Sequence, residues 1–166
     1  MNANAPLSPA FDRAWIVKHV PHSGAMCLLD EVVAWSDEAI SCIATSHLDS
    51  DNPLRSNGRL EAVCGVEYAA QAMAVHGAVL GTTTRRPRVG FLASLRNVEM
   101  HVERLDTLKE TLTVEAERVG GDANNVLYRF ALRCGDQQVI TGRAAVILDA
   151  SGADPTRGLG MQEVAR

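Results

Sequence analysis

The hydrophobic pattern along the chain changes its period near the middle. Residues 60–80 are almost continuously apolar and rich in Ala, a run too long for one strand, and they predict a buried helix. Glu61, Glu67, Gln71 and His76 interrupt this run too often for a membrane span. The helix is therefore expected to be wrapped by the rest of the protein.

Beyond this helix, apolar and polar residues alternate, as they do in strands with one buried face. Four strands are predicted there, over residues 88–102, 111–119, 126–134 and 138–148. Short connectors containing Gly and Asp favour an antiparallel meander of these four strands. Two earlier strands, 27–35 and 39–46, are expected to be joined at Ser36 and Asp37.

An antiparallel sheet with one apolar face and a single helix that is apolar all round have one economical arrangement, in which the curved sheet wraps the helix. This is the hot-dog fold, of the α+β class. One copy would leave sheet edges and part of the helix uncovered, so pairing with a second hot-dog subunit is expected. The domain is predicted to span residues 13–150, between flexible ends at 1–12 and 151–166.

Composition narrows the function. A chain of 166 residues with 46% hydrophobic residues and a net charge of -4 indicates one globular domain without a basic surface for nucleic acid. No signal peptide is visible, and the four cysteines are far apart, so we expect a cytoplasmic protein with reduced thiols. Nucleotide, dinucleotide and serine hydrolase motifs are absent, and no metal or redox cofactor is expected.

Glu67 is the first candidate for chemistry, because it lies in the middle of the apolar helix. Burial would favour the protonated form of an unpaired carboxylate, which could then hold and release a proton near neutral pH. Gln71 follows one turn later, where its amide could orient the carboxyl group. The alternative is that Glu67 meets a basic partner or solvent at a subunit surface.

Histidines supply the candidate bases. His22 lies in a loop containing Pro21 and Gly24 that leads into the first predicted strand, although most loop histidines are simply solvated. His47 precedes the segment leading back to the helix and could line the same cleft. His19 lies near His22, but no third metal ligand occurs at a recognised spacing. Backbone N–H groups at the helix start, near Ala62 and Val63, could hold a thioester oxygen.

Two segments together resemble a known family. The sequence Val20-Pro21-His22, followed by residues 26–33 (MCLLDEVV), resembles the opening of the 3-hydroxyacyl-[acyl-carrier-protein] dehydratases of fatty acid synthesis. The helical segment 65–73 (GVEYAAQAM) is similar to their acidic helix. The nearest resemblance is to the ApeP-like subgroup, which is associated with aryl polyene lipids, and it extends from Trp15 to Leu148.

The resemblance implies a hot-dog dimer with active sites at the subunit interface and acyl carrier protein as the partner that delivers the substrate. A histidine takes the C2 proton, and an acid on the central helix, matched here by Glu67, assists loss of the hydroxyl group. The main dehydratases carry that histidine in a His-Phe-Pro-Gly loop, whereas residues 51–54 here read Asp-Asn-Pro-Leu. His22 or His47 must replace it, and His22 is preferred because the ApeP-like group also lacks the loop histidine.

The leading hypothesis is therefore a dehydratase acting on 3-hydroxyacyl chains tethered to acyl carrier protein, with Glu67 and His22 as catalytic residues. The residues expected to bind substrate are Ala62, Val63, His47, Asn52 and Gln71. Two alternatives stay open: a hot-dog thioesterase, and a non-catalytic partner subunit in a hetero-oligomeric dehydratase. We expect the catalytic imidazole to face Glu67 across a dimer interface.

Overall fold

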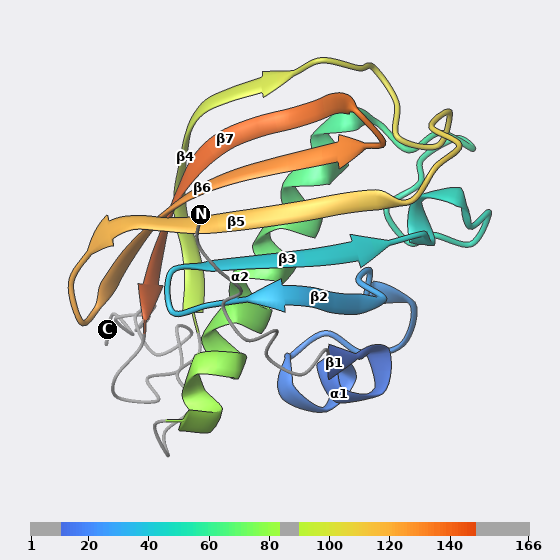
Figure 1. The fold of residues 1–166 in the computed structure, drawn as a ribbon. Coiled ribbons are helices and arrows are strands. Elements are labelled where there is room, and N and C mark those ends of the chain that lie inside the picture. Colours follow the sequence, from blue (N-terminus) through green and yellow to red (C-terminus); the bar gives the residue numbers. More distant parts are fainter. Residues whose placement is uncertain (1–10, 84–89, 149–166) are drawn as a thin grey trace, which may run out of the picture.

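A computed structural model describes residues 11–83 and 90–148, and in this part of the chain a seven-stranded antiparallel sheet curves around one long helix (Figure 1). The elements in chain order are β1 (Phe11–Asp12), α1 (Arg13–His19), β2 (Glu31–Trp35), β3 (Ala39–Ala44), α2 (Gly65–Thr83), β4 (Gly90–Met100), β5 (Leu112–Gly121), β6 (Asn125–Cys134) and β7 (Gln137–Leu148). Short 3-10 helices occur at Gly24–Met26, Ser46–Leu48 and Ala62–Cys64. The hot-dog prediction is confirmed.

The strands form where the alternation predicts them, but one of them pairs differently. The order across the sheet is β1-β2-β3-β5-β6-β7-β4, so only β5, β6 and β7 form the expected meander. β4 pairs with β7 at the far edge, and β5 pairs with β3 instead. The prediction of a four-stranded meander was wrong because the long loop between Met100 and Leu112 lets the chain pass from one edge to the middle of the sheet.

The helix α2 begins later than the apolar run. Leu60 accepts a backbone hydrogen bond from Leu105 at 2.8 Å, and Ala62 donates one to Glu103 at 2.9 Å. These tertiary hydrogen bonds hold residues 60–62 extended, so a 3-10 turn follows and regular helix starts only at Gly65.

Long and apolar segments can cross membranes, and Ala62–Gly81 qualifies by length and composition. Half of this segment is buried inside the protein, however, and core helices pass the same test. The helix packs against the concave face of the sheet, where Ala69, Ala72 and Val75 are fully buried. The sheet therefore wraps this helix, as the hydrophobic pattern predicted.

His76 joins the helix to the sheet. Its Nδ1 lies 2.9 Å from the hydroxyl of Tyr128 on β6, and its Nε2 lies 2.9 Å from the carbonyl oxygen of Ser36 in the β2–β3 turn. Burial lowers the pKa of His76 and raises that of Tyr128 to about 12. His76 is thus a packed residue between helix and sheet, whereas His101, just beyond β4, is exposed.

The predicted flexible ends lie almost entirely outside the described residues. Only positions 11 and 12 of the N-terminal end are described, and they form β1, whose Phe11 pairs with Val32. Asp12 caps α1 by accepting a hydrogen bond from the amide of Trp15 at 2.9 Å. The described domain therefore begins slightly before residue 13.

Candidate active site

His22 and Glu67 meet within one chain. The His22 Nε2 lies 3.2 Å from the Glu67 Oε1, within hydrogen-bonding distance. The two side chains are 27% and 33% exposed, so the pair lies at a surface that a substrate can reach. Glu67 is therefore neither unpaired nor fully desolvated, contrary to the expectation from its apolar helix.

Gln71 holds the Glu67 side chain of this pair in place by hydrogen bonds. One helical turn after Glu67, its Nε2 donates to Glu67 Oε1 at 3.1 Å and to the carbonyl oxygen of Met26 at 2.7 Å. Its Oε1 accepts a hydrogen bond from the backbone amide of Leu28 at 2.9 Å. Because Gln71 is only 1% exposed, it positions the helix and the His22 loop rather than contacting solvent. The structure assigns it an internal role instead of the expected contact with substrate.

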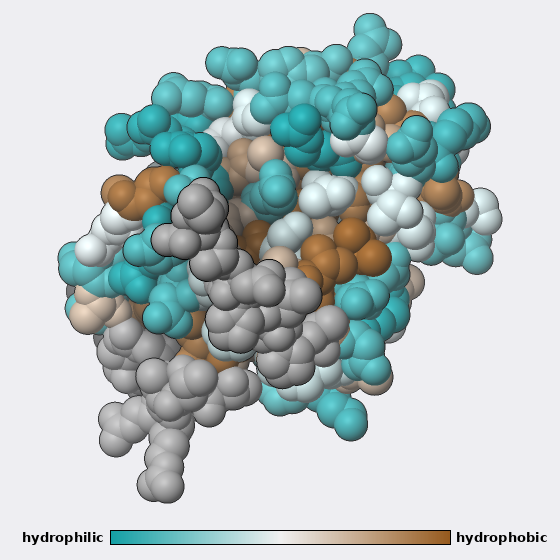
Figure 2. All heavy atoms as spheres, viewed as in Figure 1, coloured by the Kyte–Doolittle hydropathy of each residue, from teal (hydrophilic) through white to brown (hydrophobic). Residues whose placement is uncertain are grey.

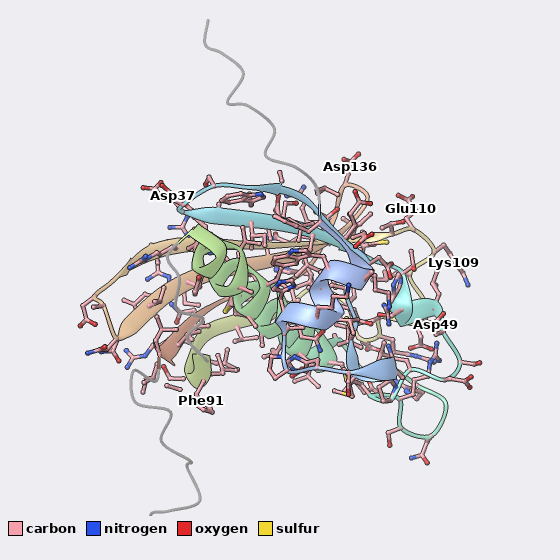
Figure 3. All side chains as sticks on the ribbon, turned by 90° about the horizontal axis from the view of Figure 1, so that it is seen from below. Asp37, Asp49, Phe91, Lys109, Glu110 and Asp136 are labelled. Atoms are coloured by element: carbon pink, nitrogen blue, oxygen red, sulfur yellow. The ribbon has the colours of Figure 1, made fainter. Side chains whose placement is uncertain are left out.

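Arg13 holds the other side of the His22 loop. Its guanidinium donates to the backbone oxygens of Leu29 and Gly24 at 3.3 and 3.5 Å, and it pairs with Asp30 at 3.4 Å. Gly24 has a φ of 58°, a conformation that favours glycine at the turn after His22. In Figure 3, α1, which carries Arg13, is seen in front of α2, and the two helices are in contact. The loop is thus tied to two helices.

Asn52 has an internal role as well. Its Nδ2 donates to the carbonyl oxygen of Ser46 at 2.9 Å and to the Tyr68 hydroxyl at 3.1 Å, while its Oδ1 accepts from the amide of Leu54. Ser46 Oγ in turn lies 2.9 Å from the Tyr68 hydroxyl and donates to the carbonyl oxygen of Leu28. Asn52 is 5% exposed, so its polar atoms serve this buried network rather than a substrate.

His47 does not face Glu67. Its side chain is completely buried, beside the backbone of Leu108 and Glu110, and burial lowers its pKa. In this structure it has no exposed surface with which to bind substrate or act as the base. Of the two candidate histidines, the structure therefore brings only His22 to the carboxylate, and it does so within one chain rather than across an interface.

The helix start offers fewer free amides than expected. The N–H of Ala62 donates to Glu103, so it is not available to a thioester oxygen. Val63 is 56% exposed and lies in the 3-10 turn just before α2, four residues before Glu67. Cys64 is partly buried, and burial raises the pKa of its thiol, which does not favour a nucleophilic thiolate.

A cavity of about 240 Å³ lies beside the network of Asn52. It is lined by Arg13, Ala25, Ser46 and residues 49–53, so it runs between the His22 loop and the loop that replaces the His-Phe-Pro-Gly segment. Asp49 marks this end of the molecule in Figure 3. Sequence reasoning missed Arg13, Ser46 and Tyr68, because their partners are distant in sequence and no local spacing identifies them.

Comparisons with known proteins concern the family and the fold. The model of the ApeP-like family, described as ApeP dehydratase, matches residues 15–154. The dehydratase heterocomplex ApeI:P from Xenorhabdus doucetiae has a TM-score of 0.71 at 22% identity, covering 81% of this chain and 90% of that one. A thioesterase from Haemophilus influenzae has a TM-score of 0.55 at 12% identity, covering 80% and 81%.

A hypothetical thioesterase protein from Streptococcus pneumoniae, solved with coenzyme A, has a TM-score of 0.53 at 12% identity, covering 71% of this chain and 84% of that one. No curated protein matches the sequence. At these identities the solved structures establish the hot-dog fold alone, whereas the family model matches most of the chain. The chain therefore belongs to the ApeP-like family of dehydratases.

Proposed function

We propose that this dehydratase removes water from 3-hydroxyacyl thioesters carried on acyl carrier protein, giving the 2-enoyl thioester, in fatty acid or aryl polyene type lipid synthesis. The observation that supports the proposal most strongly is the contact between His22 and Glu67, held by Gln71. A histidine and a carboxylate in contact form the acid–base pair that an elimination needs.

In the proposed reaction, His22 takes the C2 proton, which the neighbouring thioester carbonyl makes acidic. The electrons of the C2–H bond form the C2=C3 double bond as the C3–O bond breaks, and the hydroxyl group leaves as water with a proton from Glu67. The contact between the two side chains then lets the proton on His22 pass to Glu67, which restores the pair.

The two oxygens of Glu67 have different surroundings. Gln71 and His22 both contact Oε1, while within the described residues Oε2 takes part in no hydrogen bond. We assign Oε2 to the substrate hydroxyl. The amide of Val63, in the 3-10 turn just before α2, is the proposed donor to the thioester oxygen.

Assembly with another hot-dog subunit, identical or different, is part of this proposal. On β4, the residues Leu92, Leu95 and Met100 share the face of the buried Ala144 and Ile140 on β7. They are nevertheless 42%, 40% and 53% exposed, because α2 does not reach this edge strand. An edge strand with an uncovered apolar face is suited to a subunit interface.

The heterocomplex among the similar structures and the loss of the loop histidine favour one alternative, a subunit that stabilises a catalytic partner without reacting itself. The deciding experiment supplies a 3-hydroxyacyl carrier-protein thioester and follows enoyl formation by absorbance and mass spectrometry, with and without a second hot-dog subunit. Glu67→Gln should lower turnover by about 10²- to 10⁴-fold, because the variant cannot donate the proton.

Glu99→Gln, an exposed carboxylate on β4, serves as the matched control and should leave turnover unchanged. Unchanged turnover in Glu67→Gln would contradict the proposed mechanism and favour the non-catalytic subunit. Release of free thiol without enoyl product would instead show a thioesterase.

A further inference from the structure

Three arginines stand side by side on the convex face of the sheet. In the register of the strands, Arg96 on β4 faces Arg143 on β7, and Arg143 also faces Arg129 on β6. Phe130 and Gly142 beside them point to the helix side, so the arginines point away from it, and all three are exposed. We call these three residues the arginine row.

Such a row is unfavourable by itself. Like charges directly opposite each other on neighbouring strands destabilise a sheet. Within residues 11–83 and 90–148, the row makes one ion pair, at its end, where Arg129 lies 3.2 Å from Glu117. Both of these side chains are more than half exposed. An exposed pair of this kind contributes little to stability. An external anionic partner would relieve the repulsion between the three arginines, so the row favours binding of such a partner.

The two sides of the row differ. On one side, exposed apolar side chains of the same face follow, Leu127 at 46%, Ile147 at 47% and Phe91 at 42%. On the other side, the next row across the strands consists of Glu99, Thr141, Ala131 and Glu115, so it has a carboxylate at each end. Figure 3 shows Phe91 at the rim of the sheet, near one end of β4. The arginine row thus lies between an apolar strip and two carboxylates.

The spacing of the row indicates the shape of the partner. Neighbouring strands lie about 4.8 Å apart, so the outer arginines are about 10 Å apart at their backbones. Successive turns of an α-helix are about 5.4 Å apart, so three acidic residues one turn apart cover about 11 Å. A helix laid across the strands could place one carboxylate on each arginine and its apolar residues on Leu127 and Ile147.

We propose that the arginine row and its apolar strip dock an amphipathic helix of the acyl carrier protein, with an acidic stripe beside an apolar one. The choice of this protein rests on the proposed function, which requires the carrier to approach the dehydratase. Figure 2 views the convex face, where hydrophilic residues predominate over the upper strands. A broad anionic membrane would meet Glu99 and Glu115 together with the arginines, whereas a narrow helix avoids them.

The test separates recognition of the carrier from chemistry. Arg143→Gln, at the centre of the row, should raise KM for the carrier-bound 3-hydroxyacyl substrate about three- to fivefold and leave kcat unchanged. With a 3-hydroxyacyl pantetheine thioester, which lacks the protein, KM should not change. Arg133→Gln is the matched control, because Arg133 is exposed on the same face of β6 but outside the row.

Arg96→Gln, on a different strand, repeats the measurement and should give the same change in KM, so a folding defect in one variant does not decide the result. An unchanged KM for the carrier-bound substrate in both variants would overturn the docking site while enoyl formation still supports the proposed function. An equal rise in KM for both thioesters would also overturn it, because the effect would then not involve the carrier protein.

If the unaltered enzyme, with or without its partner subunit, produces no enoyl product, the proposed function fails. A measurement of carrier-protein binding then tests the docking site separately. Calorimetry with carrier protein bearing only its pantetheine arm should then show weaker binding for Arg143→Gln than for Arg133→Gln. Equal binding would contradict the proposal. Binding to vesicles of phosphatidylcholine and phosphatidylglycerol that depends on Arg143, without any effect on the carrier protein, would identify a membrane site instead.

Discussion

At the scale of single residues, Gln71 has the most consequential position. It hydrogen-bonds both to Glu67 and to the backbone on either side of Cys27, and thus links the acid to the loop that carries His22. The sequence places Gln71 one turn after Glu67, which is enough to predict that it orients the carboxyl group. Its contacts with Met26 and Leu28 depend on tertiary packing and could not be predicted.

Gln71→Leu should lower both stability and turnover. The variant leaves the Leu28 amide and the Met26 carbonyl without their partner, which costs about 1–3 kcal/mol for each buried group left unsatisfied. Steady-state kinetics and urea unfolding measure the two effects, with the exposed Gln138→Leu as control. Gln71→Glu retains the acceptor for Leu28 but places a second buried carboxylate against Glu67 and the Met26 carbonyl oxygen, so it should not recover the stability. If Gln71→Leu behaves like the control in both measurements, Gln71 does not position the pair.

At the scale of elements, alternation predicted where strands occur but not how they pair. Leu112, Val114 and Ala116 face the core as their pattern indicates, because that signal depends only on which side of a strand is buried. The pairing of β4 with β7 joins residues about 50 positions apart, and nothing local specifies it. The start of α2 was missed for the same reason, since Leu60 and Ala62 are held by residues 103–105.

The loop that contains Asn52 provides a test at this scale. In the comparison of residues 51–54 with His-Phe-Pro-Gly, Asp51 takes the place of the histidine and Asn52 that of the phenylalanine. Asn52→His puts a histidine one position later, where the side chain faces Ser46 and Tyr68 rather than Glu67. This variant should unfold more easily, by about 1–3 kcal/mol, and should not raise turnover. Thermal unfolding and enoyl formation are measured beside Asp51→His, which restores the histidine at an exposed position and should leave stability nearly unchanged. A gain of turnover in either variant would show that this loop does reach the substrate.

At the scale of the whole molecule, two buried histidines link folding to pH. Burial lowers the pKa of both His47 and His76 in the folded protein. Around His76, Arg118 also lowers the pKa, whereas Asp37 and the Ser36 carbonyl raise it. Unfolding returns both histidines to a pKa of about 6.5, so below that pH the unfolded chain binds more protons than the folded one.

The free energy of unfolding should therefore fall as the pH falls below about 6.5, and the contribution of these groups should be complete above it. Urea unfolding at several pH values measures the slope. His76→Gln should reduce that slope, while the exposed His101→Gln should preserve it. The same slope in His76→Gln and in the unaltered protein would show that His76 does not contribute.

The order of the elements along the chain has a consequence during synthesis. The ribosome completes α2 at Thr83, before it has made β5, β6 and β7, which together end at Leu148. Of the strands that pack on this helix, only β3 has then been translated. The nascent chain therefore passes through a stage in which most of the strands that bury α2 do not yet exist. At that stage it exposes an apolar helix that is long enough to cross a bilayer. That stage is where we expect a chaperone to bind.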